Sequence, residues 1–197
     1  MSSAARALSF TFDDGPDARW TPRVLDRLAA CRVTATFFMV GERVQTAPGP
    51  AQAVLAAGHE VQLHCHRHVR HTELSEAELR EDAESALTEL ELAGARPSLW
   101  RAPWGVCTDA SFRVAARLGL RLVRWSIDTH DWRGDPPQSM LARARARLGT
   151  GGAVLMHDAL GPGCTRAGCQ NTLALLAPLA AAARSRGLAL EPMAAAA

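Results

Sequence analysis

The segment LSFTFDDGP, residues 8–16, decides the expected fold of this chain. Its first five residues are apolar, aromatic or β-branched or carry a small hydroxyl, which favours a buried β-strand. The strand ends at two adjacent carboxylates, Asp13 and Asp14, followed by a Gly15-Pro16 turn. Two acids at a strand end can serve as a metal ligand and a proton acceptor. The alternative is an ordinary Asp-Asp-Gly-Pro turn without a chemical role.

Beyond this segment, short apolar runs alternate with longer amphipathic ones in about seven β/α units, which predicts an α/β fold with a parallel sheet, open or closed into a barrel. In the clearest helix, Ser75 and Glu78 form a capping box and Gly94 occupies the position after the last turn. The expected strands cover residues 8–12, 34–40, 60–64, 98–101, 121–125, 153–156 and 188–191, and the expected helices cover residues 20–30, 45–57, 75–93, 109–118, 138–148 and 171–186.

Length and composition predict one globular domain over residues 1–197, since 48% of the residues are hydrophobic and no linker or repeat interrupts the chain. All 22 basic residues are arginines, which excludes a lysine nucleophile or Schiff base. No basic run interleaved with aromatic residues indicates a nucleic-acid partner. No apolar stretch is long enough to span a membrane.

The first eight residues lack a secretory signal, so we expect a cytoplasmic protein, or a secreted one if the N-terminus has been trimmed. The five cysteines are an odd number at irregular spacings, which does not indicate a disulfide framework. Cys164 and Cys169 could pair across a loop, but the spacing favours two free thiols.

Five of the seven histidines lie within residues 59–71. Imidazole is the commonest transition-metal ligand, and two histidines with a carboxylate suit a catalytic Zn²⁺ or a similar ion. The spacing of His64 and His68 places both rings on one face if the strand continues into a helical turn. His66 and His71 compete with them on spacing, and a solvated histidine-rich loop is the alternative to a metal site.

Three further segments place polar side chains after expected strands, where the functional groups of parallel α/β sheets gather. Arg101 begins the segment RAPWG and could hold a carboxylate in two hydrogen bonds, or lie on an ordinary surface loop. Segment 125–132, WSIDTHDW, carries two carboxylates between two tryptophans that could stack on sugar rings or belong to the core. His157 emerges from the apolar strand 153–156, where a lone histidine is more often structural.

Taken in order, these five segments resemble the motifs of the polysaccharide deacetylases, the NodB homology domain of carbohydrate esterase family four. The matching stretches are TFDDGP, HxxxH, RxPxG, DxxDW and LxH, in order over residues 9–157. The resemblance implies a distorted (β/α)7 barrel, in agreement with the count of β/α units. It also implies a metal-dependent hydrolase that removes the N-acetyl group from an amino sugar and releases acetate.

Carried onto this sequence, the resemblance implies that Asp14, His64 and His68 bind a divalent metal, Zn²⁺ first, with Co²⁺ and Ni²⁺ as alternatives. It assigns the catalytic roles to four residues: Asp13 is the general base, oriented by Arg101, and His157 is the general acid, held by Asp131. Trp104 contributes its backbone N–H to the oxyanion, and Trp125 and Leu155 line the pocket for the acetyl methyl group.

The chain departs from the family pattern at Cys65, where a serine or threonine usually braces the loop after the first metal histidine. A thiol is a weaker hydrogen-bond partner, and Cys65 as an additional soft ligand is an alternative. We expect the segment 159–170 to shape the substrate site. The expected substrate is a small N-acetylated sugar or oligosaccharide; the same metal site also suits an O-deacetylase or a hydrolase of a non-sugar amide or cyclic imide. A catalytically silent metal- or sugar-binding module is disfavoured, because a binding module needs neither Asp13 nor His157.

Overall fold

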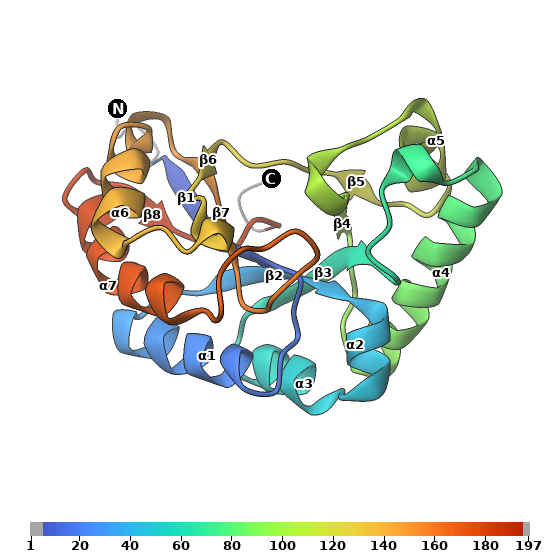
Figure 1. Cartoon of the computed structure of the whole chain (residues 1–197), viewed down its shortest axis with the longest axis horizontal. Coiled ribbons are helices and arrows are strands. Elements are labelled where there is room, and N and C mark those ends of the chain that lie inside the picture. The colour runs from blue at the N-terminus through green and yellow to red at the C-terminus, as the bar shows by residue number, and fades with distance from the viewer. Residues whose placement is uncertain (1–5, 195–197) are drawn as a thin grey trace, which may run out of the picture.

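A sheet of parallel strands forms the centre of the molecule, and helices cover its outer side (Figure 1). The computed structural model describes residues 6–194, so the two ends of the expected domain 1–197 lie outside the described residues. The strands are β1 (Ala7–Asp13), β2 (Ala35–Val40), β3 (Glu60–Cys65), β4 (Leu99–Trp100), β5 (Arg121–Leu122), β6 (Ile127–Asp128), β7 (Gly152–His157) and β8 (Ala189–Leu190).

The strand order is β5-β4-β3-β2-β1-β7-β6, with β8 paired to the start of β1. Every described strand pair is parallel. The two outer strands of this order, β5 and β6, are joined by the segment 123–126, which crosses the gap between them (Figure 1). The curled sheet is therefore an incompletely closed barrel, and the predicted distorted (β/α)7 barrel is confirmed.

Helices follow most strands, as a parallel sheet requires. Helix α1 contacts α3 and α7, α7 contacts α6, and α4 contacts α2 and α5. Within residues 6–194 no helix has the length and apolar character needed to cross a membrane. The helices are α1 (Trp20–Cys31), α2 (Gly41–Thr46), α3 (Gly49–Ala56), α4 (Glu76–Leu92), α5 (Asp109–Arg117), α6 (Pro137–Arg145) and α7 (Gln170–Arg184).

Two predicted elements differ in the structure. The helix expected over residues 45–57 is divided into α2 and α3, with Pro48 between them; proline lacks the N–H that an uninterrupted helix needs. The strand expected over residues 121–125 is limited to Arg121–Leu122, and the short strand β6 at Ile127–Asp128 was not predicted. A two-residue strand carries too little periodicity to be recognised from sequence.

The helix predicted over residues 75–93 forms with the expected cap. The Ser75 amide donates to Glu78 Oε2 at 2.8 Å, and the Glu78 amide donates to Ser75 Oγ at 3.3 Å. Gly94 has a φ of 98°, a left-handed conformation that glycine adopts without steric cost. Local sequence signals therefore determine both ends of α4.

The hydrophobic core lies between the sheet and its helices. Phe12 of β1 stacks on Phe37 of β2 with ring centroids 4.9 Å apart, and both side chains are fully buried. Strands β1, β2 and β3 are buried along almost their whole length, as expected for strands covered on both faces. This buried frame fixes the carboxyl ends of β1, β3 and β7, where the polar side chains gather.

Candidate active site

Asp13 and Asp14 leave the end of β1 in different directions. Asp13 continues the strand and lies in register with His157, the last residue of β7. Asp14 has a φ of 74°, a left-handed conformation that aspartate tolerates better than most residues. Asp13 therefore contacts Arg101, while Asp14 contacts His64 and His68. Both carboxylates are buried, which an ordinary surface turn does not require.

Asp14, His64 and His68 bring three possible metal ligands together. Asp14 Oδ1 lies 3.3 Å from His64 Nε2 and 3.0 Å from His68 Nε2. Burial raises the pKa of the Asp14 carboxyl, but its interactions with the imidazoles of His64 and His68 hold this pKa well below its usual value. The site therefore keeps an ionised carboxylate facing two ring nitrogens.

The hydrogen bonding of His64 fits a cation at this place. Its Nδ1 lies 2.6 Å from the carbonyl oxygen of Arg101, so Nδ1 carries a proton and donates it. In the neutral ring Nε2 then presents a lone pair to Asp14 Oδ1. Two acceptors 3.3 Å apart repel each other unless a proton or a metal ion lies between them. One carboxylate and two imidazoles match a catalytic zinc site that keeps open positions.

His68 reaches this site by a different route from the predicted one. It does not stand on a helical turn; it has a φ of 51° in the loop after β3, and its amide donates to Cys65 Sγ at 3.2 Å. Cys65 thus braces the loop through its sulfur, and burial raises the pKa of its thiol well above the usual value. Its thiol is not one of the groups that converge on Asp14.

The competing histidines lie elsewhere. His71 Nδ1 is 2.8 Å from Ser111 Oγ, and burial lowers the pKa of this ring to about 4, so His71 is neutral and packs against Trp100. His66 Nδ1 is buried without a hydrogen-bond partner within the described residues, close to Gly41. Neither ring joins the cluster at Asp14.

Arg101 is fully buried and holds Asp13. Its Nη1 donates to Asp13 Oδ1 at 2.8 Å and to Thr11 Oγ1 at 2.7 Å. Its guanidinium carbon lies 4.1 Å from the centroid of the Phe38 ring, which fixes its plane. The alternative of a surface arginine on a loop is wrong, because the side chain has no exposed area.

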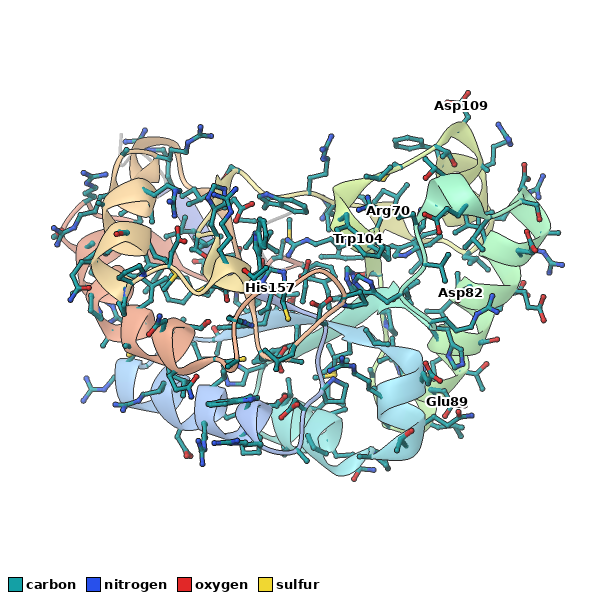
Figure 2. All side chains as sticks on the ribbon, in the orientation of Figure 1. Arg70, Asp82, Glu89, Trp104, Asp109 and His157 are labelled. Atoms are coloured by element: carbon teal, nitrogen blue, oxygen red, sulfur yellow. The ribbon has the colours of Figure 1, made fainter. Side chains whose placement is uncertain are left out.

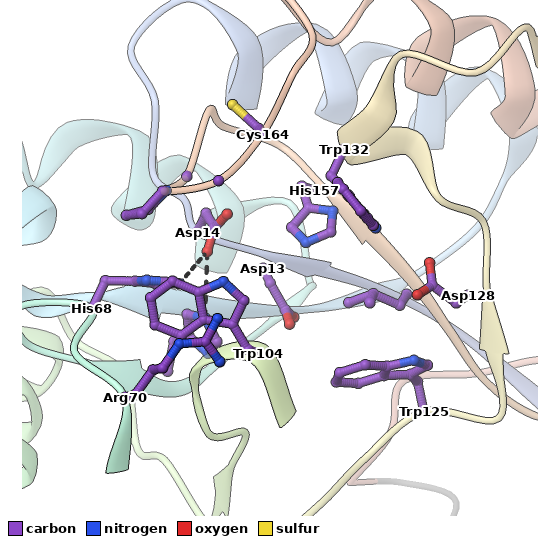
Figure 3. Close-up of a pocket in the computed structure, with 15 residues that line it drawn as sticks. Asp13, Asp14, His68, Arg70, Trp104, Trp125, Asp128, Trp132, His157 and Cys164 are labelled. Carbon is purple, nitrogen blue, oxygen red and sulfur yellow. Dashed lines mark ion pairs between the residues drawn. The ribbon is translucent and has the colours of Figure 1, made fainter. Parts of the chain in front are cut away.

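His157 is held by a buried carboxylate. Its Nδ1 lies 2.7 Å from Asp131 Oδ1, and its amide donates to Asp131 Oδ2 at 2.9 Å. Burial lowers the pKa of His157, but the charge and hydrogen bond of Asp131 raise it to about 9. His157 is therefore cationic at neutral pH, with Nε2 free to donate into the cavity beside Asp13 (Figure 3).

Asp131 is held in turn by Arg166. Arg166 Nη1 donates to Asp131 Oδ2 at 2.8 Å, and the hydroxyl of Thr172 donates to the same oxygen at 2.8 Å. Burial raises the pKa of Asp131, but His157 and Arg166 lower it to about 2. Asp131 thus remains ionised although it is completely buried.

The Asp14, His64 and His68 cluster, Asp13 and His157 line one cavity of about 400 Å³, a volume typical of small-molecule sites. Figure 2 shows His157 on one side of this cavity and Trp104 and Arg70 on the other. The predicted pocket residues Trp104, Trp125 and Leu155 all line it. The remaining lining residues are Asp13, Asp14, His64, His68, Arg70, Asp128, Trp132, His157, Gly161, Pro162, Gly163 and Cys164.

Comparisons with known proteins identify the family. The family model described as polysaccharide deacetylase matches residues 2–123. The chain belongs to the polysaccharide deacetylase family. Metal dependence is typical of this family of carbohydrate deacetylases, and Asp14, His64 and His68 are three described residues of this chain that could hold a metal ion.

Relatives that are carbohydrate deacetylases match most of the length of this polysaccharide deacetylase. A chitooligosaccharide deacetylase of Bradyrhizobium sp. (strain ANU 289) is 34% identical over 97% of this chain and 90% of its own length. A peptidoglycan-N-acetylglucosamine deacetylase of Bacillus cereus is 36% identical over 78% of this chain and 73% of its own length. A solved family 4 carbohydrate esterase from Streptomyces lividans, in complex with acetate, superimposes with a TM-score of 0.84 at 29% identity over 94% of this chain and 92% of its own.

Sequence reasoning missed several residues that line or support the site of this family member. Asp128 lies within the segment 125–132, but the sequence predicted no function for its carboxylate; Trp132, one of the two tryptophans expected to stack on sugar rings or to belong to the core, also lines the cavity. Arg70 lies inside the histidine-rich stretch and Arg166 nine residues after His157, and neither had a signal, because each acts through tertiary contacts. The segment 159–170 does contribute to the pocket through Gly161, Pro162, Gly163 and Cys164. Cys164 and Cys169 are both free thiols.

Proposed function

We propose that this chain is a metal-dependent deacetylase that hydrolyses the N-acetyl group of an amino sugar, a GlcNAc-type oligosaccharide or small glycoconjugate, and releases acetate. One observation carries the proposal: Asp14, His64 and His68 converge beside Asp13 and His157 in a single cavity. A binding module would need a metal ligand set but neither a base nor an acid. The deacetylase activities of the chitooligosaccharide and peptidoglycan relatives support the same reaction.

Zn²⁺ is the ion we propose for the three ligands, with Co²⁺ and Ni²⁺ as alternatives, since imidazole and carboxylate suit all three. When bound, the ion supplies Lewis-acid chemistry, polarising the acetyl carbonyl and making water more acidic. Asp14, His64 and His68 would hold it with one oxygen and two ring nitrogens. The carbonyl of Arg101 fixes the tautomer of His64, as metal-bound histidines require.

Asp13 is proposed as the general base. Arg101 donates to one carboxylate oxygen and is itself held by Thr11, and the other carboxylate oxygen remains available to accept a proton from the attacking water. The guanidinium does not need to move during the reaction, because packing on Phe38 and complete burial hold it in place. This arrangement orients the base without solvent rearrangement.

His157 is proposed as the general acid. Its pKa of about 9 keeps Nε2 protonated at neutral pH, so it can give that proton to the departing amide nitrogen. Positioned acids and bases of this kind typically contribute about 10²–10⁴-fold to the rate. Trp125 and Leu155 would contact the acetyl methyl group, and the backbone N–H of Trp104 would donate to the oxyanion. Trp104 has a φ of 53°, a left-handed conformation that is unusual for a bulky residue.

Acetate release tests this proposal. The purified chain would be stripped with a chelator, supplied with Zn²⁺ or Co²⁺, and assayed on N-acetylglucosamine, its β-linked conjugates and chitin oligomers. We expect metal-restored release, and loss of release in Asp13→Asn and His157→Ala, while Asp26→Asn on the exposed face of α1 serves as the matched control. Wild-type rates in Asp13→Asn would refute the mechanism. Bound metal without release from any of these sugars would refute the sugar substrate.

A further inference from the structure

The cavity has different charges on its two sides. His68, Trp104 and Arg70 lie together on one side, while Asp128 lies on the other, near Trp125 and Trp132 (Figure 3). Most other charges at the site are already matched by a partner. Arg101 pairs with Asp13, and His157 and Arg166 pair with Asp131. Asp14 faces the two metal-binding histidines.

Arg70 differs from these groups. Its guanidinium carbon lies 4.1 Å from the centroid of the Trp104 ring. Within residues 6–194 no carboxylate lies within ion-pair distance of Arg70, although it is half-buried and lines the cavity. Arginine stacked on an indole loses little conformational freedom on binding, because the ring already fixes the plane of its N–H donors. Arg70 is therefore a pre-positioned cation without a protein anion.

Trp104, on which Arg70 stacks, is itself in contact with a metal-ligand histidine. The His68 ring meets it edge-on with centroids 4.4 Å apart. Gly163 of the loop 161–164 lines the same cavity as Trp104. The stack of Arg70 on Trp104 is consequently attached to the loop that carries His68. Its position relative to the reacting acetyl group is defined by the fold.

We propose that Arg70, stacked on Trp104, binds an anionic substituent, a carboxylate or a phosphate, on the N-acetylated substrate. The inference rests on the proposed deacetylase function and narrows its substrate class. A planar guanidinium donates two parallel hydrogen bonds to either group, and such charge-assisted bonds are the stronger kind. Asp128 on the other side of the cavity disfavours an anion there. A substrate with one charged end is thereby oriented in a single direction.

A purely structural role for Arg70, packing on Trp104 alone, is the competing explanation. It predicts that removing the charge affects all substrates equally. The test compares neutral N-acetylglucosamine and its methyl glycoside with N-acetylglucosamine 1-phosphate, N-acetylglucosamine 6-phosphate and N-acetylmuramic acid, which carries a carboxylate. The methyl ester of N-acetylmuramic acid is the neutral control for the carboxylate.

Each substrate would be assayed for acetate release with the wild type, Arg70→Gln, Arg70→Lys and the exposed control Arg121→Gln. We expect the wild type to prefer at least one anionic substrate roughly 10-fold, mainly through KM, the size of one charge-assisted hydrogen bond. Arg70→Gln should abolish this preference, so that the ratio of kcat/KM for each anionic substrate to that of its neutral partner falls to about one. Arg70→Lys should retain part of it, and raised salt should weaken it.

The outcomes separate the two proposals. Phosphate preference without carboxylate preference, or the reverse, identifies the anion and supports the inference. Equal release from neutral and anionic substrates, or a preference that persists in Arg70→Gln, overturns the inference and leaves the deacetylase intact. No release from any substrate overturns the proposed function itself, and the inference with it.

Discussion

Arg166 forms a buried ion pair with Asp131, with 2.8 Å between Nη1 and Oδ2. The same guanidinium donates from Nη2 to the carbonyl oxygens of His157 and Ala159, at 3.1 and 2.9 Å. One side chain therefore connects the carboxylate that holds the proposed general acid to the start of the pocket loop. Arg166 is a positioning residue, since it contacts no group expected to react.

Replacing Arg166 tests this connection. In Arg166→Met, Asp131 loses its cationic partner, so the pKa of His157 should rise and the alkaline limb of the kcat profile should move to higher pH. We also expect kcat to fall by roughly 10²-fold, the lower end of what a general acid contributes. Breaking a buried ion pair costs about 3–5 kcal/mol of stability.

The conservative variant separates charge from packing. Arg166→Lys keeps the positive charge beside Asp131 but cannot make all the carbonyl contacts, so its alkaline limb should stay near that of the wild type while kcat falls. The profiles of both variants would be compared with their urea unfolding curves. An unshifted limb in Arg166→Met, in a folded sample, would show that Arg166 is structural only.

The pH dependence of the wild type follows from His157. Its pKa of about 9 lies above the usual 6.5, so the imidazolium is present below pH 9 and is lost as the pH rises through that value. The ion pair of His157 with Asp131 stabilises the folded state fully below pH 6.5, and this stabilisation is lost as the pH rises through about 9. We expect activity to decline above pH 9.

Asp131→Asn should move the alkaline limb of the activity profile to lower pH. Without the Asp131 carboxylate, burial lowers the pKa of His157 and only the charges of Asp14 and Asp13 still raise it, so this pKa should fall from about 9 toward 6.5. The amide can still accept a hydrogen bond from Nδ1, so the ring orientation is largely kept. Acetate release measured from pH 5 to 10 should show the alkaline limb displaced by more than one pH unit, and an unchanged limb would exclude His157 as the titrating acid.

The sequence predicted those parts of the site that depend on strand ends. Asp13, His64, Arg101 and His157 each lie at or next to the carboxyl end of a parallel strand, so the order of β/α units was enough to bring them together. The capping signals at Ser75 and Gly94 are equally local, and both were confirmed.

Features that depend on the path of a loop could not be predicted. His68 reaches Asp14 through a left-handed residue rather than a helical turn, and the HxxxH spacing fits either geometry. Arg166 binds Asp131 across 35 residues of sequence, and nothing in its surroundings distinguishes it from the other arginines. The division between α2 and α3 at Pro48, by contrast, had a readable signal.

Asp158 gives the protein a second pH dependence, in stability rather than activity. Its Oδ2 accepts a hydrogen bond from Thr21 Oγ1 at 2.5 Å, and Oδ1 is buried without a partner within the described residues. Burial raises the pKa of this carboxyl to about 7 from 3.8. Between pH 4 and 7 the Asp158 carboxyl is therefore protonated in the folded state but ionised in the unfolded state. Its contribution to the free energy of unfolding is complete below pH 4 and is lost as the pH rises through 7.

Asp158→Asn should remove the pH dependence of stability that Asp158 causes. The amide has the same shape but does not titrate, so the stability of the variant relative to the wild type should increase between pH 4 and 7, by up to ~4 kcal/mol. Urea unfolding at several pH values measures this difference. The exposed variant Asp26→Asn controls for net charge, and a difference that does not depend on pH would show that Asp158 is ionised in the folded protein.

Gly161 of the pocket loop packs so closely against Asp14 that no larger side chain fits at its position. A Cβ at this position would overlap Oδ2 and approach Cγ of Asp14, while the backbone of Gly161 is outside the left-handed region and accepts alanine. Gly161→Ala should therefore displace either the Asp14 carboxylate or the loop, without disturbing the core. We expect metal affinity to fall by roughly 10-fold to 100-fold, as it does when the orientation of a metal ligand is disturbed.

The matched control is Gly49→Ala at the start of α3, where an added Cβ meets no atom within 4 Å. Metal affinity would be measured by competition with a chromophoric chelator, and folding by thermal unfolding of the metal-free proteins. Gly161→Ala should lose affinity with a nearly unchanged metal-free melting temperature, whereas Gly49→Ala should change neither. Wild-type metal affinity in Gly161→Ala would mean that the added methyl group displaces the loop and not the Asp14 carboxylate. In that case the KM for acetate release should rise, because the loop lines the substrate cavity.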